Sequence, residues 1–285
     1  MTKPAFVRLA LALASLVWCG TASAETPLER GAYLVNSVAA CGNCHTPFGP
    51  NGPDMTRKLS GRLVEKNPAF DAYAPNITPD EKTGIGSWTD AQIVKAVREG
   101  VRPDGSIIGP PMPIGLYRGL SDTDIQAIVA YLRTVKPVGN TEPKSLYRIP
   151  LPPSYGPPVG HVPDVPEGVT VAYGAYLAGP VAHCVECHST PGPMGPDWQH
   201  ALGAGGMKFE GPWGVSVAPN LTPHADGIRD LTDQQVATII TTGTRPDGSE
   251  MFPPMGYGYY AHMKPTDVAA IIKYLRSIPP LPDPK

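Results

Sequence analysis

The apolar residues of this chain recur with a helical spacing. In the stretch after Ser121 they lie three and four residues apart, which places them on one face of a core-packed helix. The positions are Ile125, Ile128, Val129 and Leu132, and the stripe returns at Val268, Ile271, Ile272 and Leu275. No good run alternates apolar and polar residues as a strand does. The pattern therefore predicts an all-α fold.

Capping residues indicate where other helices begin and end. Thr89 and Gln92 have the spacing of a capping box, and Gly100 is a typical helix terminator. The same device returns at Thr232, Gln235 and Gly243. The first helices of the two halves are expected over Leu28–Val38 and Val171–Ala178.

The last helix of each half has its own start signal. Ser121 followed by Asp124 predicts a second kind of capping box, with Asp124 as the partner. Lys264 replaces this serine in the other half, where Pro265 suits the first turn of a helix.

The chain is a duplication. Gly31–Leu34 recurs as Gly174–Leu177, and Arg102–Ser106 recurs as Arg245–Ser249, with the same offset along the chain in both cases. Because a solenoid needs three or more short repeats, two copies of about 110 residues predict two tandem domains.

Residues 137–168 separate the copies. This segment holds nine prolines, which exclude helix and favour extended structure. We expect a semi-rigid Pro-rich strap between a domain at residues 25–136 and a domain at residues 169–285.

The N-terminus has the pattern of a secretory signal peptide over residues 1–24. Lys3 and Arg8 precede the apolar run Leu9–Trp18, and Ala22–Ala24 offers a small-residue cleavage site. The prediction is export to the periplasm with Glu25 as the first mature residue; an uncleaved anchor is the alternative. No later apolar run is long enough to span a membrane.

Charge and composition narrow the class of protein. Cleavage would remove two basic and no acidic residues, which takes the formal net charge from −2 to −4. Nucleic acid is therefore not expected as a partner, since it calls for a basic face. The 36 prolines and 31 glycines indicate a loop-rich chain that needs something to pack around.

The chemistry lies in two C-x-x-C-H motifs, Cys41–His45 and Cys184–His188. Cys41 and Cys44 can add to the vinyl groups of one haem, and Cys184 and Cys187 to those of a second. The adjacent His45 and His188 would then ligate the irons. The motifs predict two covalent haem c groups.

Paired cysteines also occur in three kinds of site other than a haem attachment site. A dithiol redox site needs a thioredoxin-like setting, which the sequence lacks. A four-thiolate zinc site would have to join motifs that lie in separate repeats. A disulfide is possible in an exported chain, but it would leave the histidines unexplained.

A sixth iron ligand is expected at a matching place in both copies. Met112 follows His45 at the same spacing as Met255 follows His188, and each methionine lies after two prolines. A thioether is a soft ligand that raises the reduction potential. Two alternatives stay open: that the methionines only pack, or that His200 or His262 takes the place of Met255.

The sequence resembles tandem class I cytochrome c domains over nearly all of residues 25–280, and especially dihaem cytochromes c and the cytochrome c subunits of bacterial periplasmic dehydrogenases. The stretches that carry the resemblance are Gly84–Asp90, Pro103–Gly105, Pro111–Pro113 and Leu120–Arg133. The resemblance implies His45/Met112 and His188/Met255 as axial pairs, with Gly31 in contact with the Tyr131 region and Gly174 with the Tyr274 region.

The expected function is single-electron transfer from a dehydrogenase, acting on an alcohol, aldehyde, sugar or N-heterocycle, to a downstream cytochrome or oxidase. No residue is expected to be catalytic. The alternative is a dihaem enzyme, such as a cytochrome c peroxidase or a thiosulfate-oxidising cytochrome.

Overall fold

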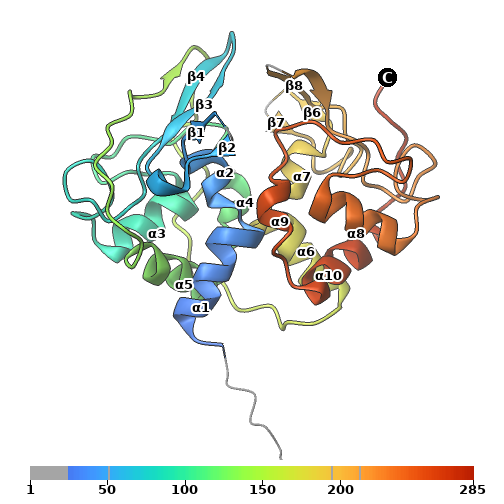
Figure 1. The fold of residues 1–285 in the computed structure, drawn as a ribbon, viewed down its shortest axis with the longest axis horizontal. Helices are drawn as coiled ribbons and strands as arrows, with labels where there is room; N and C mark the ends of the chain where they lie inside the picture. Colours follow the sequence, from blue (N-terminus) through green and yellow to red (C-terminus); the bar gives the residue numbers. More distant parts are fainter. Residues whose placement is uncertain (1–24, 51, 194, 212) are drawn as a thin grey trace, which may run out of the picture.

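The computed structural model describes residues 25–285 except 51, 194 and 212. The predicted signal peptide, residues 1–24, lies outside the described residues. Figure 1 shows two similar halves side by side, each with helices below and small hairpins above.

The helices follow the same order in both halves. In the first half they are α1 (Pro27–Tyr33), its π-helical continuation (Leu34–Val38), α2 (Cys41–His45), α3 (Asp90–Glu99), α4 (Ile114–Tyr117) and α5 (Asp122–Leu132). In the second half they are α6 (Val171–Tyr176), its π-helical continuation (Leu177–Val181), α7 (Cys184–Cys187), α8 (Asp233–Thr242), α9 (Tyr257–Tyr260) and α10 (Pro265–Leu275).

The capping boxes of α3 and α8 are confirmed. The Thr89 hydroxyl accepts the Gln92 amide, and the Gln92 side chain accepts the Thr89 amide; α8 repeats the arrangement. Gly100 and Gly243 end these helices in the left-handed conformation, with φ of 69° and 72°. Ser121 also caps α5, but Asp124 does not complete the box, because its carboxylate binds Arg30 and Tyr176 instead.

The expectation of an all-α fold is wrong. The described residues are 33% helical and 12% strand. The strands are β1 (Phe48–Gly49), β2 (Gly52–Pro53), β3 (Arg62–Lys66), β4 (Phe70–Ala74), β5 (Leu146–Tyr147), β6 (Pro191–Gly192), β7 (Gly195–Pro196), β8 (Lys208–Gly211) and β9 (Gly214–Val217).

These strands form four small antiparallel sheets, ordered β1-β2, β3-β4-β5, β6-β7 and β8-β9. The longest are β3 and β4, and a bulge between Leu63 and Glu65 breaks the alternation in β3. Such short, irregular strands leave no periodic signal in a sequence. Turn formation and pairing with neighbouring backbone hold them instead.

The first and last helices of each half cross at a glycine. A Cβ atom on Gly31 would overlap the carbonyl oxygen of Ala127 and lie 2.9 Å from Cβ of Tyr131. Gly174 stands in the same relation to Ala270 and Tyr274. The contacts implied by the resemblance are therefore present, and only glycine allows this approach.

The two halves share one hydrophobic core. Its buried cluster includes Leu34 and Ile125 of the first half and Leu177 and Ile271 of the second. Tyr117 of α4 meets His183 edge to face across the boundary, with ring centroids 5.8 Å apart. Figure 1 accordingly shows α2, α4, α7 and α9 gathered where the halves meet.

Residues 137–168 lie against the first half. They contain β5, which pairs with β4 at Phe70 and Asp71, and no helix. The Tyr155 phenol also donates to the carbonyl of Ile108 at 2.8 Å.

Candidate functional site

The paired cysteines lie on the short helices α2 and α7. A left-handed residue precedes each helix, Ala40 with φ 46° and His183 with φ 44°, so the chain turns sharply out of the preceding helix. Cysteines three positions apart then share one face of a helical turn. All four thiols are free, as attachment to a haem requires.

The motif histidines are buried and held at one ring nitrogen. His45 and His188 are 7% and 8% exposed. Nδ1 of His45 lies 2.8 Å from the Pro75 carbonyl oxygen, and Nδ1 of His188 lies 2.8 Å from that of Pro219. A carbonyl oxygen only accepts, so Nδ1 carries the proton in both rings. Nε2 is left as the metal-binding atom.

Burial also keeps both imidazoles neutral. It lowers the pKa of His45 to about 4, although the hydrogen bond to Pro75 opposes the shift, and it lowers the pKa of His188 in the same way. A neutral imidazole is the form that ligates iron.

Two buried asparagines fix the loops that supply these carbonyls. Asn76 Nδ2 donates to the Val138 carbonyl at 2.6 Å, and its Oδ1 accepts the Thr78 amide at 2.9 Å. In the second half, Asn220 Nδ2 donates to the Leu281 carbonyl, and its Oδ1 accepts the Thr222 amide. Sequence analysis missed the role of Pro75 and Pro219. The available signal was the Asn-x-Thr-Pro segment that follows each proline in both copies.

Met112 and Met255 are half-buried against the core, each just before a short helix. The loops close on themselves, since the Ile114 amide donates to the Met112 carbonyl at 2.8 Å and the Tyr257 amide to that of Met255 at 3.1 Å.

The helices after the two methionines place a tyrosine beside the cysteines of their own half. Burial raises the pKa of Tyr117 well above its ordinary value, and the nearby Cys41 and Cys44 add to the shift. The pKa of Tyr260 is raised in the same way beside Cys184 and Cys187. The tyrosine that follows each methionine therefore lies near the cysteines of the same half, while α4 and α9 also contact the opposite half at His183 and Gly42.

The residues fit a haem c better than the other cysteine sites. Burial raises the pKa of Cys41 and Cys184 to about 12, whereas a dithiol oxidoreductase needs a lowered thiol pKa. Within the described part of the chain, no three His, Cys, Asp or Glu side chains group closely enough to hold a metal ion. Two thiols that can add to the porphyrin vinyl groups, an imidazole with a free Nε2 and a thioether are the groups that attach and ligate haem c.

The two histidines that the sequence offers as alternatives to Met255 lie at the surface. The His200 side chain is 78% exposed and contacts Asp197 at 3.1 Å. His262 is exposed as well.

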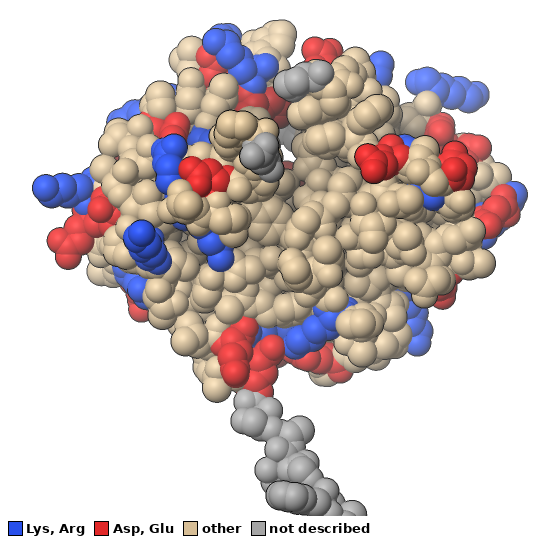
Figure 2. All heavy atoms as spheres, in the orientation of Figure 1, with Lys and Arg blue, Asp and Glu red and all other residues tan. Residues whose placement is uncertain are grey.

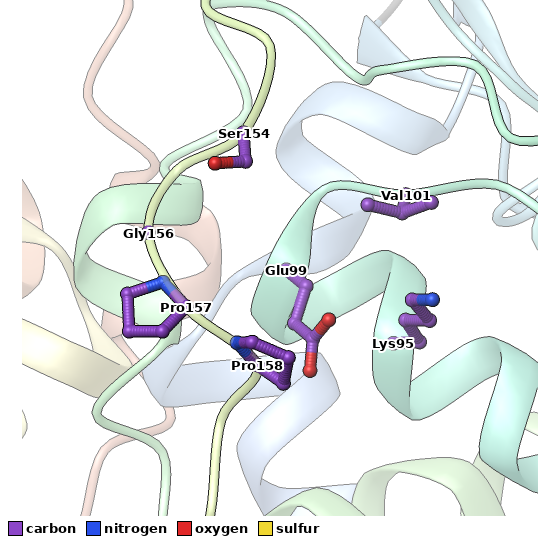
Figure 3. A pocket seen from close by; sticks show the side chains of 7 residues that line it. All are labelled: Lys95, Glu99, Val101, Ser154, Gly156, Pro157 and Pro158. Atoms are coloured by element: carbon purple, nitrogen blue, oxygen red, sulfur yellow. The ribbon is translucent and has the colours of Figure 1, made fainter.

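A surface cavity lies elsewhere, between α3 and the segment 137–168 (Figure 3). It is lined by Lys95, Glu99, Val101, Ser154, Gly156, Pro157 and Pro158. None of the predicted site residues lines it, and it opens to solvent.

Comparison with known proteins identifies the class. The cytochrome c family model matches residues 28–136. Residues 28–136 therefore match a cytochrome c domain, and the chain is similar to proteins of the cytochrome c family. Covalently bound haem c with iron is the cofactor of that family.

Particular relatives match both halves. The cytochrome c subunit of a quinone alcohol dehydrogenase from Gluconobacter oxydans is 32% identical over 92% of this chain and 56% of its own length. A fructose dehydrogenase cytochrome subunit from Gluconobacter japonicus is 34% identical over 90% and 54%. A dihaem c-type cytochrome from Cereibacter sphaeroides is 29% identical over 85% and 83%. The chain thus spans little more than half the length of the two dehydrogenase subunits.

By their names, these relatives are cytochrome subunits of dehydrogenases or a cytochrome, which supports the prediction of an electron-transfer cytochrome rather than an enzyme. In the described ranges, moreover, no helix combines the length and apolar character that crossing a bilayer demands.

Proposed function

We propose that this protein is a periplasmic dihaem cytochrome c that carries single electrons. One haem would be held by Cys41 and Cys44, with His45 and Met112 as axial ligands. The other would be held by Cys184 and Cys187, with His188 and Met255. When bound, each haem iron takes up and releases one electron.

The arrangement of the motif histidines is the observation that carries the proposal. Both lie beside the cysteines of a short helix, both are buried, and both hold Nδ1 at 2.8 Å from a proline carbonyl. A duplicated structural motif of this kind supports a second haem beyond residues 28–136, where the family model matches.

The chain's own residues would do four things. The thiols tether the porphyrin, so that a loop-rich fold keeps its cofactor. The proline carbonyls fix the imidazole tautomer, as outer-shell partners do in other metal sites. The methionine thioethers raise the potential, and burial excludes water from the ligands.

We infer that the electrons come from a dehydrogenase and leave to a cytochrome or oxidase. The names of the relatives support the donor, and the signal-like residues 1–24 support export. Figure 2 shows acidic and basic side chains interspersed around the rim of one face, with an uncharged centre where the halves meet. Domains at 25–136 and 169–285, joined by the strap 137–168, remain our proposed division.

The test is expression with the native N-terminus in a host that matures c-type cytochromes. We expect two haems per chain by the pyridine haemochrome assay and a mature chain that begins at Glu25. Replacing Cys41 and Cys44 together with alanine should leave one haem by denaturing mass spectrometry. A colourless protein, or wild type with a single haem, would disprove the proposal.

A further inference from the structure

Asn43, in the first C-x-x-C-H motif, contacts the loop of the second methionine. Its Nδ2 donates to the carbonyl of Pro254 at 3.0 Å, across 211 residues of sequence. Pro254 immediately precedes Met255. On the other side of that methionine, a Cβ atom on Gly256 would lie 3.3 Å from Cγ of Asn43. The Asn43 amide therefore lies against the backbone on both sides of Met255.

Neighbouring contacts make this connection rigid. The Asn43 carbonyl accepts a hydrogen bond from Nη2 of Arg62 at 2.8 Å. One residue earlier, Gly42 meets the phenol oxygen of Tyr259, and a Cβ atom there would overlap it. Tyr259 belongs to α9, the helix after Met255. Helix α2 of the first half thus packs directly on the methionine-bearing segment of the second.

The equivalent loop of the first half is held differently. There the Tyr147 phenol, from the strap, donates to the Pro110 carbonyl at 2.9 Å. Leu151 and Tyr147 also pack against Gly109. Among the described residues, Glu186, which matches Asn43 in the second motif, makes no hydrogen bond to this loop.

The second loop has less support of its own. Phe252 is 56% exposed, and Pro253 and Pro254 are exposed too. Among the described residues, no hydrogen bond joins the strap to Phe252, Pro253 or Pro254. The bond from Asn43 is therefore a main constraint on where Met255 lies.

We propose that Asn43 is a positioning residue for Met255, so that ligation in the second half depends on the haem-binding motif of the first. This inference rests on the proposed function, because Met255 must be an axial ligand for it to matter. It goes further by coupling the two sites through one side chain.

The experiment compares Asn43→Leu with Tyr147→Phe in the full-length, haem-loaded protein. Leucine has the same number and branching of side-chain heavy atoms as asparagine but donates no hydrogen bond, and phenylalanine removes only the hydroxyl that holds the first loop. Met112→His in the same background identifies which spectroscopic and redox signals belong to the first haem.

The readout is displacement of methionine from the oxidised protein by added imidazole, followed by loss of the methionine-to-iron charge-transfer band. Loss of one hydrogen bond in Asn43→Leu should raise the apparent imidazole affinity of the second haem roughly fivefold, the factor for about 1 kcal/mol. The first haem should keep its wild-type affinity. In Tyr147→Phe the imidazole affinity of the first haem should rise, and that of the second should keep its wild-type value. In Asn43→Gln, which keeps a donor, the affinity of the second haem should stay within about twofold of wild type.

Unchanged affinity at the second haem in Asn43→Leu, or an equal change at both haems, would overturn the inference. If that variant does not take up haem, Asn43→Ser makes the same test with a smaller change. The haem content of the wild-type protein distinguishes failure of the proposed function from failure of the inference about Asn43. Fewer than two haems in wild type would refute the proposed function, whereas two haems with a silent Asn43→Leu would refute this inference alone.

Discussion

The phenol of Tyr176 donates a hydrogen bond of 2.6 Å to the buried carboxylate of Asp124, which lies in the other half of the molecule. The equivalent residues of the two copies repeat the bond in the opposite direction, with Tyr33 donating to Asp267 at 2.7 Å. The two halves therefore meet through the same surface on each, as the subunits of a symmetric dimer do. Retention of this tyrosine and aspartate in both copies has a structural reason.

Replacing Asp124 with alanine should destabilise the protein strongly. Asp124 also binds the buried Arg30 through two hydrogen bonds, of 2.7 and 2.9 Å. Burial disfavours the charge on Arg30, but the bonds to Asp124 outweigh this and raise its pKa above the ordinary value. Loss of the carboxylate would remove two hydrogen bonds from this cation and leave the more exposed Glu167, at 3.0 Å, as its nearest acidic partner. We therefore expect a cost of about 3 kcal/mol in the free energy of unfolding, the lower end for breaking a buried ion pair.

Asp267→Ala is the matched control, because no arginine takes the place of Arg30 beside it in the described chain. Tyr176→Phe should cost only about 1 kcal/mol, since Arg30 still satisfies the carboxylate. Chemical denaturation of the three variants measures these differences. Equal losses in Asp124→Ala and Asp267→Ala would contradict the account.

The crossing of α6 and α10 gives a second prediction, Gly174→Ala. Its new methyl group would overlap the Ala270 carbonyl, so the two helices must separate. Overpacking of this kind costs about 1–3 kcal/mol, and backbone contact places this site at the upper end.

Gly179→Ala, further along the same helical segment, has no atom within 4 Å of the added carbon. It should be neutral or slightly stabilising. Thermal unfolding of the two variants makes the comparison, and a Tm for Gly174→Ala equal to that of wild type would show that the crossing can relax.

Local signals in the sequence predicted where the helices begin and end. They did not predict features that depend on residues far away in the sequence. Thr89 and Gln92 lie within one turn, so their capping box could be recognised from spacing alone. Asp124 has the right spacing from Ser121, but its carboxylate is taken by Arg30, 94 residues away. No local pattern distinguishes these two cases.

In the candidate site, too, the sequence indicated the residues within local motifs but not their distant partners. The duplicated motifs pointed to Cys41, His45 and their equivalents, and the structure places Tyr117, which follows Met112, near the cysteines of the first motif. The carbonyl that orients His45 comes from Pro75, 30 residues later. The bond between Asn43 and Pro254 joins different copies, so comparison of the copies does not reveal it. Folding alone creates such contacts.

Stability in acid should depend on Asp122. Hydrogen bonds from Arg98, and then from His161, lower the pKa of this carboxyl from 3.8 to about 2. A lowered folded-state pKa contributes stability above the unfolded value that is lost as the pH falls through the folded one. The stability difference between wild type and Asp122→Asn should therefore shrink as the pH falls from about 4 to about 2. Urea denaturation at a series of pH values measures it, and a difference that stays constant over this range would refute the assignment.

Exchange of the axial methionines should separate the two haems electrochemically. A thioether favours Fe(II) more than an imidazole does, so Met112→His should lower one reduction potential and Met255→His the other. Each substitution should leave the second potential nearly unmoved, because the changed ligand contacts only its own iron. Spectroelectrochemical titration of the two variants resolves the potentials. A variant in which neither potential falls would show that the methionine it replaces is not a ligand, and an equal fall in both would show that the substitution does not act on one iron alone.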